Sequence, residues 1–360
     1  MSNMMDMESP DNEILQEDLE RAAVLDLPVE ALRDARVFVT GATGLLGSQM
    51  VKYLLCLNRL KGYRITVIAH VRNREKAERV FPYGGRNGQL VLAVGDINDR
   101  ISYDGEVDYI IHGASPTSSK FFVSHPVETI HTALDGTENV LAFAREKRVK
   151  GMVYLSSLEV YGTPREDAGL ISEGDYGMID PLSVRSSYSE GKRMAECLCV
   201  SHGEEYGIPI KIARLSQTFG AGVAYDDGRV FAEFARCAIE KRNIVLHTEG
   251  KTVRSYCYTM DAITALLYIL VKGEPGEAYN VTNMDTAISI YDMAKLVCEL
   301  YPESGIAVEK DIPEDLASFG YNPEMVIRLD STKLEGLGWK ATVGLEGMYR
   351  RLVSDMCRGR

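Results

Sequence analysis

Short apolar runs alternate with longer helical patterns through the first two thirds of the chain. Six of the short runs have the composition of β-strands. They lie at residues 36–40, 64–71, 89–94, 108–115, 151–157 and 208–215. Helical patterns follow at 48–60, at 125–147 and from residue 188 onward. Strands that alternate with helices predict an α/β fold with a doubly wound parallel sheet and right-handed crossovers.

A glycine-rich turn follows the first strand. Gly41, Gly44 and Gly47 stand in the sequence GATGLLG, directly before a helical pattern. Glycines at this spacing permit a tight turn and let the backbone approach a pyrophosphate, which sits where unpaired N–H groups of a helix N-terminus favour anions. The sequence therefore predicts a Rossmann-type dinucleotide site. Asp96, after the third strand, is placed to accept a hydrogen bond from the adenine amino group.

The end of the second strand bears on the choice of cofactor. It reads His70-Val-Arg72-Asn-Arg74 and offers no acid to the adenosine ribose. An acid at this place is typical of NAD sites, whereas an arginine suits the 2′-phosphate of NADP. We expect NAD because of the remaining motifs, with NADP as the alternative.

The pattern divides the chain into three parts. We expect residues 36–216 to form the NAD(P)-binding Rossmann domain. Residues 217–360 are expected to form mainly a smaller C-terminal substrate-binding lobe, with some segments returning to the first domain. Residues 1–35 form an acidic extension that contains one helical stretch, EILQEDLERAAVL. We interpret this extension as solvated and only partly docked; a specific oligomer contact is the alternative.

Tyr188 and Lys192 form the second candidate site, in the sequence YSEGK at the start of a helical pattern. Residues four apart share a helical face. A phenol is a poor base at neutral pH, but an ammonium beside it favours the phenolate and lowers its pKa. The pair is suited to general acid–base catalysis, in which a proton is moved to or from a hydroxyl or a ketone oxygen.

Composition narrows the class of protein. The formal net charge is −12, yet residues 1–35 alone hold ten acidic and two basic side chains. The rest is only mildly acidic, which argues against nucleic-acid and anionic-membrane partners. Seven cysteines without a CxxC or Cys/His cluster fit reduced thiols, so we expect a cytoplasmic protein without a zinc site. The run AITALLYILV is too short to span a bilayer and indicates a buried helix.

These motifs resemble those of the extended short-chain dehydrogenase/reductases that act on nucleotide sugars, the NAD-dependent epimerase/dehydratase family. The likeness runs from about residue 36 to 339 and includes GATGLLG, HGAS, LSSLEVYG, YSEGK and ARLSQTFG. Within this family, residues 173–196 and the loops DDGRV and VRSYCYTMD are most similar to the UDP-glucuronate decarboxylases. The resemblance implies a UDP-linked nucleotide sugar as substrate, and we expect a homodimer.

The resemblance also implies a mechanism. Tyr188 takes the proton from the sugar 4-hydroxyl as hydride passes to the nicotinamide, and Lys192 holds the phenolate and bonds the nicotinamide ribose. The ketone formed at C4 lies β to the C6 carboxylate, so carbon dioxide leaves readily before the hydride returns. Ser157 corresponds to the hydroxyl residue that bonds the 4-oxygen, and Glu159 to a glutamate that handles protons around C5.

Binding residues follow from the same likeness. Those expected to hold the cofactor are Gly41, Thr43, Gly44, Leu45, Leu46, Gly47, Arg72, Asp96, Ile97, Ala114, Ser115, Tyr188 and Lys192. Those expected to hold the substrate are Pro116, Arg185, Gln217, Arg229 and Arg254. Guanidinium groups match diphosphate and carboxylate oxygens in bidentate geometry. No metal is expected.

Purely structural roles remain open for several of these residues. Ser157 could simply cap its loop, Glu159 could be a solvated loop carboxylate, and Arg229 and Arg254 could be surface ion-pair partners. Leu158 stands where decarboxylases have serine and 4,6-dehydratases an aspartic acid, which disfavours a dehydratase because leucine cannot donate a proton.

Ala133 replaces an asparagine of a proton relay, and Gln217 replaces an asparagine near the nucleotide. The alternative functions are a 4-epimerase, a 4,6-dehydratase, an NADP-dependent ketoreductase and a non-catalytic redox sensor.

Overall fold

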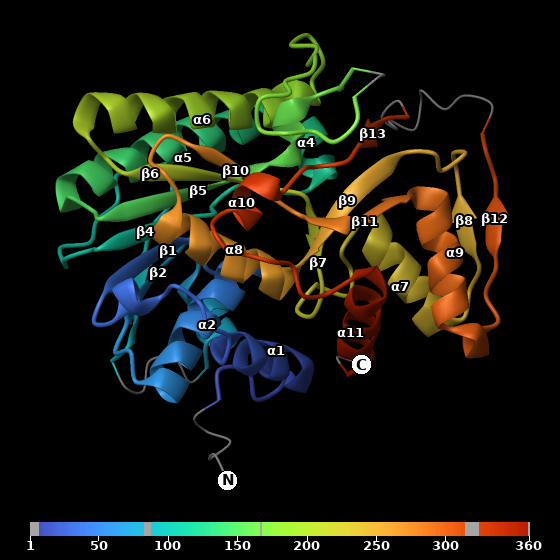
Figure 1. Ribbon diagram of the computed structural model, residues 1–360, viewed down its shortest axis with the longest axis horizontal. Coiled ribbons are helices and arrows are strands. Elements are labelled where there is room, and N and C mark those ends of the chain that lie inside the picture. Colours follow the sequence, from blue (N-terminus) through green and yellow to red (C-terminus); the bar gives the residue numbers. More distant parts are fainter. Residues whose placement is uncertain (1–6, 83–87, 166–167, 314–323, 359–360) are drawn as a thin grey trace.

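A seven-stranded parallel sheet forms the centre of the molecule (Figure 1), as a computed structural model shows. The structure describes residues 7–82, 88–165, 168–313 and 324–358. The strand order is β10-β6-β5-β4-β1-β2-β3, and all neighbours pair in parallel. The strands are β1 (Arg36–Thr40), β2 (Thr66–Val71), β3 (Leu90–Val94), β4 (Tyr109–His112), β5 (Gly151–Ser157), β6 (Ile210–Leu215) and β10 (Ala278–Val281). The predicted doubly wound α/β fold is confirmed.

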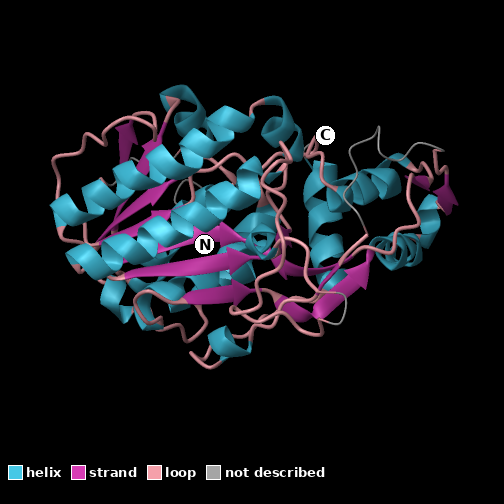
Figure 2. Ribbon diagram, turned by 90° about the horizontal axis from the view of Figure 1, so that it is seen from above, coloured by secondary structure: helices cyan, strands magenta, loops and turns pink. Residues whose placement is uncertain are grey.

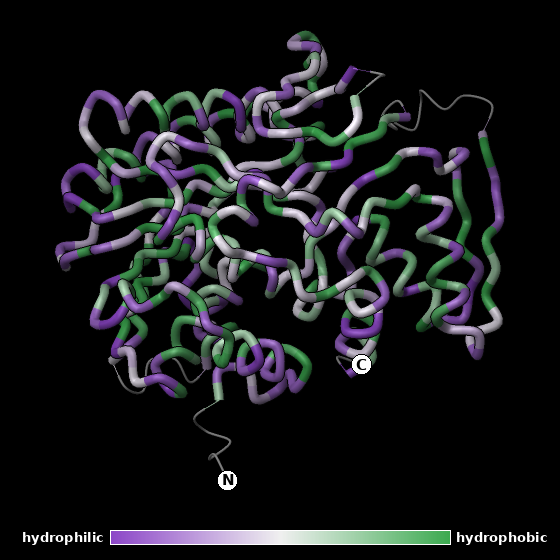
Figure 3. The backbone as a smooth tube through the Cα atoms, in the orientation of Figure 1, coloured by the Kyte–Doolittle hydropathy of each residue, from purple (hydrophilic) through white to green (hydrophobic). Residues whose placement is uncertain are grey.

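Helices cover both faces of this sheet (Figures 1 and 2). Alternate residues of the strands point to opposite faces, so Phe38 packs with α5 and α6 while Val37 and Val39 pack with α2 and α8. The apolar stretches gather between these layers (Figure 3). The covering helices are α2 (Leu45–Lys61), α5 (Pro126–Lys147), α6 (Ser186–Tyr206) and α8 (Thr259–Lys272), with the short α3 (Arg74–Val80) and α4 (Ser119–Ser124) in the connections.

Helix α8 contains the run AITALLYILV, and twelve of its fourteen residues are buried. The predicted buried helix is confirmed. In the part of the chain that the structure describes, no helix is long and apolar enough to cross a bilayer.

The C-terminal part of the chain builds a smaller lobe beside the strand ends. Its strands β7 (Gln217–Phe219), β9 (Val253–Tyr258), β11 (Asn283–Ser289) and β13 (Val326–Ile327) form a mixed sheet. β8 (Ile244–Leu246) pairs with β12 (Val308–Lys310), and the helices of the lobe are α7 (Val230–Glu240), α9 (Ile290–Leu300) and α11 (Leu345–Arg358). The short α10 (Thr332–Glu335) packs on β10 of the large sheet. Strand β10 lies in the large sheet, which supports the proposal that segments after residue 216 return to the first domain.

Helix α1 (Glu13–Ala23) is docked far more deeply than the sequence suggested. Leu15, Leu19, Ala22 and Ala23 are all buried, and they belong to one apolar core with α2, α8 and the helices of the C-terminal lobe. The interpretation of a mostly solvated extension is therefore wrong for this helix. Its acidic composition concealed the docking, because the acids lie on the faces that the apolar stripe leaves free.

One carboxylate of α1 is nevertheless buried. Asp18 accepts a hydrogen bond from the Tyr258 hydroxyl and lies 2.6 Å from the Arg351 guanidinium. Tyr258 ends β9 and Arg351 belongs to α11, so this carboxylate joins the N-terminal helix to two elements of the C-terminal lobe. Burial raises the pKa of Asp18, while the bonds from Tyr258 and Arg351 act in the opposite direction.

Because α1 is docked, shortening one of its buried side chains should markedly lower the stability of the protein. Leu19 is fully buried, so Leu19→Ala should lower the free energy of unfolding by about 2–5 kcal/mol. Val24 follows the helix and is 74% exposed, so Val24→Ala is the matched control and should change little. Urea denaturation of both variants checks this expectation. Equal midpoints for the two variants would mean that α1 does not pack in solution as described.

Candidate active site

The carboxyl ends of β1 and β4 meet at the centre of the sheet, where the chain connections leave in opposite directions. Gly41 follows β1 with φ of +66°, and a Cβ there would lie 2.7 Å from the Gly113 carbonyl oxygen. A Cβ on Gly47 would lie 2.1 Å from the Gly41 carbonyl oxygen. Glycine is therefore the residue that lets this loop, the next helix and the end of β4 touch through their backbones.

Helix α2 begins directly after this loop, at Leu45. Its N-cap residue is Gly44, and no side chain caps the first turn. The first N–H groups of a helix have no partner within it, and the helix dipole favours an anion there. Thr43, Leu45 and Leu46 are partly exposed around this end. The glycine cradle and the uncapped helix fit a dinucleotide pyrophosphate.

Thr40 and His112, which the sequence analysis did not select, join the two central strand ends. The Thr40 hydroxyl lies 2.7 Å from Nδ1 of His112 and accepts hydrogen bonds from the backbone N–H groups of Gly113 and Ala114, each at 3.1 Å. Burial and the nearby charge of Lys192 lower the pKa of His112 to about 3, so the ring is neutral. His112 belongs to the motif HGAS, but the sequence alone does not show that its partner is Thr40, seventy-two residues earlier.

The loop after β4 continues through Ser115 and Pro116, both half-buried. The Ser115 hydroxyl donates to the Pro116 carbonyl oxygen at 3.2 Å. These residues lie beside the glycine loop, because Gly41 contacts the backbone of Gly113 and Ala114. The residues predicted for this end of the cofactor are thus brought together.

Arg72 and Asp96 lie at the neighbouring ends of β2 and β3. Their closest side-chain atoms are 3.9 Å apart, and the Arg72 side chain is 74% exposed. Asp96 also accepts a hydrogen bond from the Asn98 N–H at 2.9 Å, which orients its carboxylate. Ile97 is buried against Gly136 of α5 and anchors this loop. A cation and an anion therefore stand side by side where the adenosine end of a dinucleotide is expected.

Lys192 is buried one turn after Tyr188 on α6. Its ammonium donates a hydrogen bond of 2.7 Å to the Leu155 carbonyl oxygen in β5 and lies 5.9 Å from the centre of the Tyr188 ring. Burial lowers the pKa of Lys192 to about 8, and the carboxylate of Glu196 acts in the opposite direction. The two residues share one face of the helix, as their spacing predicts.

The ring of Tyr188 is half-buried, and another aromatic ring covers one of its faces. The Phe122 ring of α4 stacks on it with centroids 4.2 Å apart and planes 8° apart. Burial raises the pKa of Tyr188 to about 12, while the Ser157 hydroxyl and the Arg229 guanidinium act in the opposite direction. The lowered pKa that the sequence suggested is thus not produced by the side chains of the protein, because desolvation outweighs them.

Ser157 and Glu159 flank the phenol from the end of β5. Ser157 accepts a 3.2 Å hydrogen bond from the Glu159 N–H and so begins the short helix η3 (Leu158–Tyr161). The Glu159 carboxylate lies 3.6 Å from Arg185 and accepts a hydrogen bond from Ser189 at 3.4 Å. Its side chain is 27% exposed, so it is a half-buried loop carboxylate held by a cation.

Arg254 and Arg229 differ in their surroundings. Arg254 is 9% exposed, and the one hydrogen bond of its guanidinium among the described residues goes to the Val253 carbonyl oxygen at 3.3 Å. Burial lowers the pKa of Arg254, and the charge of Glu159 opposes this shift. Arg229 instead pairs with Asp227 at 2.6 Å. Gln217, at the start of β7, is half-buried.

Leu158 and Ala133 have packing reasons for their identity. Leu158 is buried in a small apolar cluster with Val160 and Leu329, below the loop rather than in the site. Ala133 lies so close to Gly191 that a Cβ on the glycine would be 3.1 Å from the alanine methyl group. A larger side chain at Ala133 would therefore press on α6 next to Lys192.

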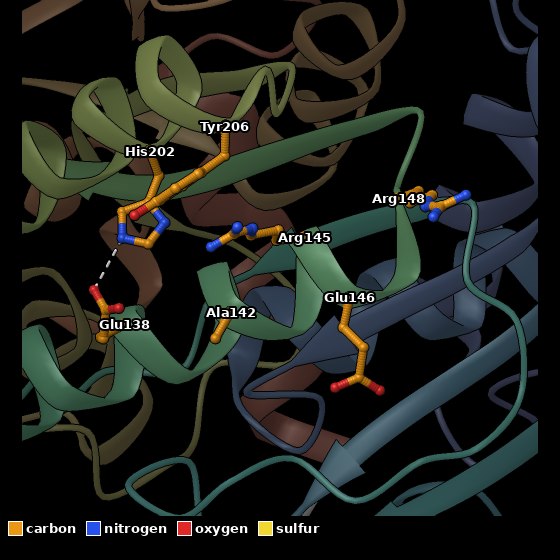
Figure 4. A pocket seen from close by; sticks show the side chains of 7 residues that line it. All are labelled: Glu138, Ala142, Arg145, Glu146, Arg148, His202 and Tyr206. Atoms are coloured by element: carbon orange, nitrogen blue, oxygen red, sulfur yellow. Dashed lines mark hydrogen bonds and ion pairs between the residues drawn. The ribbon is translucent and has the colours of Figure 1, made fainter.

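A surface hollow lies elsewhere on the molecule (Figure 4). Its lining comes from α5, from the residue after it and from the far end of α6, where His202 bonds Glu138 at 3.1 Å. Tyr206 on its rim is eighteen residues after Tyr188, which places the two about 27 Å apart along the helix axis. This hollow is separate from the candidate active site.

Comparisons with known proteins agree with this fold. Residues 37–282 match the model of the NAD dependent epimerase/dehydratase family. The chain is similar to UDP-glucuronic acid decarboxylase 6 of Arabidopsis thaliana, at 32% identity over 87% of this chain and 86% of the relative.

Two solved structures share the fold at lower sequence identity. One is a dTDP-glucose 4,6-dehydratase from Streptomyces venezuelae with NAD bound, at a TM-score of 0.74 and 22% identity, over 90% of this chain and 98% of that one. The other is a UDP-glucuronic acid 4-epimerase from Bacillus cereus in complex with UDP-glucuronic acid and NAD. Its TM-score is 0.72 and its sequence identity 20%, over 90% of this chain and 100% of that one. The chain belongs to the NAD-dependent epimerase/dehydratase family and is built as a nucleotide-sugar modifying enzyme.

Proposed function

We propose that the protein is a UDP-glucuronate decarboxylase that forms a UDP-pentose through transient oxidation at C4. The observation that carries this proposal is the cationic side of the site. Arg254 is buried without a carboxylate within 4.0 Å among the described residues, and Arg185 lies 3.6 Å from Glu159. A buried guanidinium without a carboxylate in direct contact is costly, so it favours an anionic ligand such as a sugar carboxylate or a diphosphate.

The glycine cradle and the first turn of α2 would hold the pyrophosphate of NAD, and Asp96 would bond the adenine. When bound, the nicotinamide supplies hydride acceptance and return at C4. Lys192 is placed to bond the nicotinamide ribose and to favour the phenolate of Tyr188. Its pKa of about 8 leaves it mostly protonated at neutral pH.

Tyr188 and Ser157 act on the oxygen at C4. The phenolate of Tyr188 takes the proton of the 4-hydroxyl, and Ser157 donates a hydrogen bond to the same oxygen. The resulting ketone lies β to the C6 carboxylate, so the bond to that carboxylate breaks with release of carbon dioxide and leaves an enolate. Glu159 is the group near the site that can manage the proton added at C5.

An exposed apolar stripe supports the homodimer that we also propose. Met194, Cys197 and Val200 follow one another at intervals of three residues on α6, and Val127 and Ile130 belong to α5, which packs against α6. All five side chains are exposed. Covering such a stripe with a second copy would remove apolar surface from water.

The reaction itself gives the first functional test. Purified protein with UDP-glucuronate should yield a UDP-linked product lighter by carbon dioxide, without net consumption of NAD, because the same cofactor that removes the hydride returns it. Mass spectrometry of the nucleotide pool checks this. Epimerised UDP-glucuronate of unchanged mass would show a 4-epimerase instead, and steady oxidation of reduced cofactor would show a reductase.

Glu159→Gln separates hydride transfer from the later steps. The amide keeps the size and hydrogen-bonding capacity but removes the base, so oxidation proceeds while the steps after it stall. In a single turnover, reduced nicotinamide absorbing near ~340 nm should accumulate. Tyr188→Phe is the companion variant, because it should lower turnover by about 10²-fold before any reduced nicotinamide forms. Wild-type rates in Glu159→Gln would make Glu159 a plain loop carboxylate.

The cofactor prediction concerns Arg72. Arg72→Asp places a second carboxylate beside Asp96, which would accept bonds from the ribose 2′-hydroxyl and repel a 2′-phosphate. The ratio of NAD to NADP affinity should therefore rise. Calorimetric titration of both cofactors into the wild type and the variant measures this ratio. An unchanged ratio would place Arg72 away from the ribose.

A further inference from the structure

A buried ion pair lies directly behind the active site. Arg214 of β6 and Glu196 of α6 face each other with side chains that are 2% and 9% exposed. The guanidinium approaches the carboxylate at 2.7 Å through Nη2 and at 3.0 Å through Nε. Neither residue has a part in the chemistry proposed above.

Every N–H of the Arg214 guanidinium has an acceptor. Nη1 donates to the Tyr161 hydroxyl at 3.1 Å and to the Glu173 carbonyl oxygen at 2.7 Å. Nη2 donates to the Tyr176 hydroxyl at 2.6 Å as well as to Glu196. A guanidinium carries five N–H groups, so with Nε its donors are fully used. One side chain therefore ties together β6, α6, η3 and the loop before α6.

The partners of this pair adjoin the candidate catalytic residues. Glu196 lies one helical turn after Lys192 on α6. It also accepts a 2.5 Å hydrogen bond from Ser156, the residue before Ser157. Tyr161 is the last residue of η3, the short helix that carries Glu159. Each segment that delivers a catalytic side chain is thus bonded to the pair.

Stability of the fold is a weak explanation for this arrangement. Removing two charges from water costs several kcal/mol per ion, and replacing a buried pair by apolar residues of similar volume is often neutral or stabilising. What apolar residues cannot reproduce is the set of directed bonds to Tyr161, Tyr176 and Ser156.

We propose that the Arg214–Glu196 pair is the positioning device of this active site, which fixes η3, the end of β5 and α6 relative to one another. The pair acts by positioning Ser157, Glu159 and Lys192. This inference therefore rests on the proposed function, which assigns those three residues their roles. A misplacement of about 1 Å at such residues costs about 10²-fold in rate.

Glu196 has a second effect, through its charge. Its carboxylate favours the ammonium form of Lys192 and so opposes the burial that lowers the pKa of that residue. Removing the carboxylate should lower the Lys192 pKa further. The other titratable groups that face the ammonium come from α6, β4 and β5: Cys199, Tyr188, His112 and Tyr154.

A double variant separates positioning from stability. Glu196→Leu combined with Arg214→Met should keep the melting temperature near that of the wild type, yet lower kcat about 10- to 100-fold with little change in KM. The control is Arg36→Met with Asp108→Leu, which removes a less buried ion pair of 2.8 Å at the amino ends of the central strands β1 and β4, away from the active site. The control should leave kcat unchanged. A stable double variant at Arg214 and Glu196 with wild-type kcat would overturn the proposal.

A single variant tests the charge without needing the substrate. Glu196→Gln keeps the shape, and NAD affinity measured by calorimetry from pH 6 to 10 reports the ammonium that bonds the ribose. Because the Lys192 pKa falls when the carboxylate is removed, the loss of affinity at high pH should begin at lower pH than in the wild type. An unmoved profile would contradict the proposal, even if the double variant fails to fold. If the wild type does not turn over UDP-glucuronate, only the proposed function fails, and this profile still decides the inference.

Discussion

The structure depends on one backbone contact, between Gly41 after β1 and Gly113 after β4. The two glycines meet closer than any side chain permits, and this fixes where α2 begins and where the loop after β4 runs. Thr40 and His112 hold the same two strand ends together from beneath. The position of the glycine loop and the course of the loop that leads to Phe122 therefore both depend on the backbone contact between Gly41 and Gly113. All later geometry, including the cover over the Tyr188 ring, is built outward from that point.

Burial disfavours the charged form of three side chains near the carboxyl ends of the strands. It raises the pKa of Tyr188 and lowers the pKa of Lys192, so in the protein alone both shifts favour the uncharged side chain. Arg254 experiences the same penalty. A site of this kind gains its charge pattern when anionic and cationic ligands enter, because each ligand compensates a side chain that water no longer reaches. Ligand binding and activation of the proton-transfer groups are then one event.

The sequence predicted much of the fold, because the sheet rests on local signals: short apolar runs, helical spacing and glycines at a turn. The family resemblance implied that Ser157, Glu159 and Tyr188 act at one site, and the structure places these three residues close together at the end of β5 and the start of α6. The sequence could not predict how deeply α1 docks, because besides α2 the partners of this helix are α8 and α11, over two hundred residues away. The Phe122 stack and the five bonds of Arg214 were hidden for the same reason, as each needs coordinates of segments distant in sequence.

The docked N-terminal helix changes what counts as the folding unit of this protein. The family match begins at residue 37, yet one apolar core runs from α1 through α2 and α8 into the C-terminal helices. A chain cut at the family boundary would leave an open groove along three helices and an unpaired Arg351 at its rim. The two lobes are thus held by an element that the family description does not contain. Because α1 packs against both lobes, we expect it to restrict their motion relative to each other.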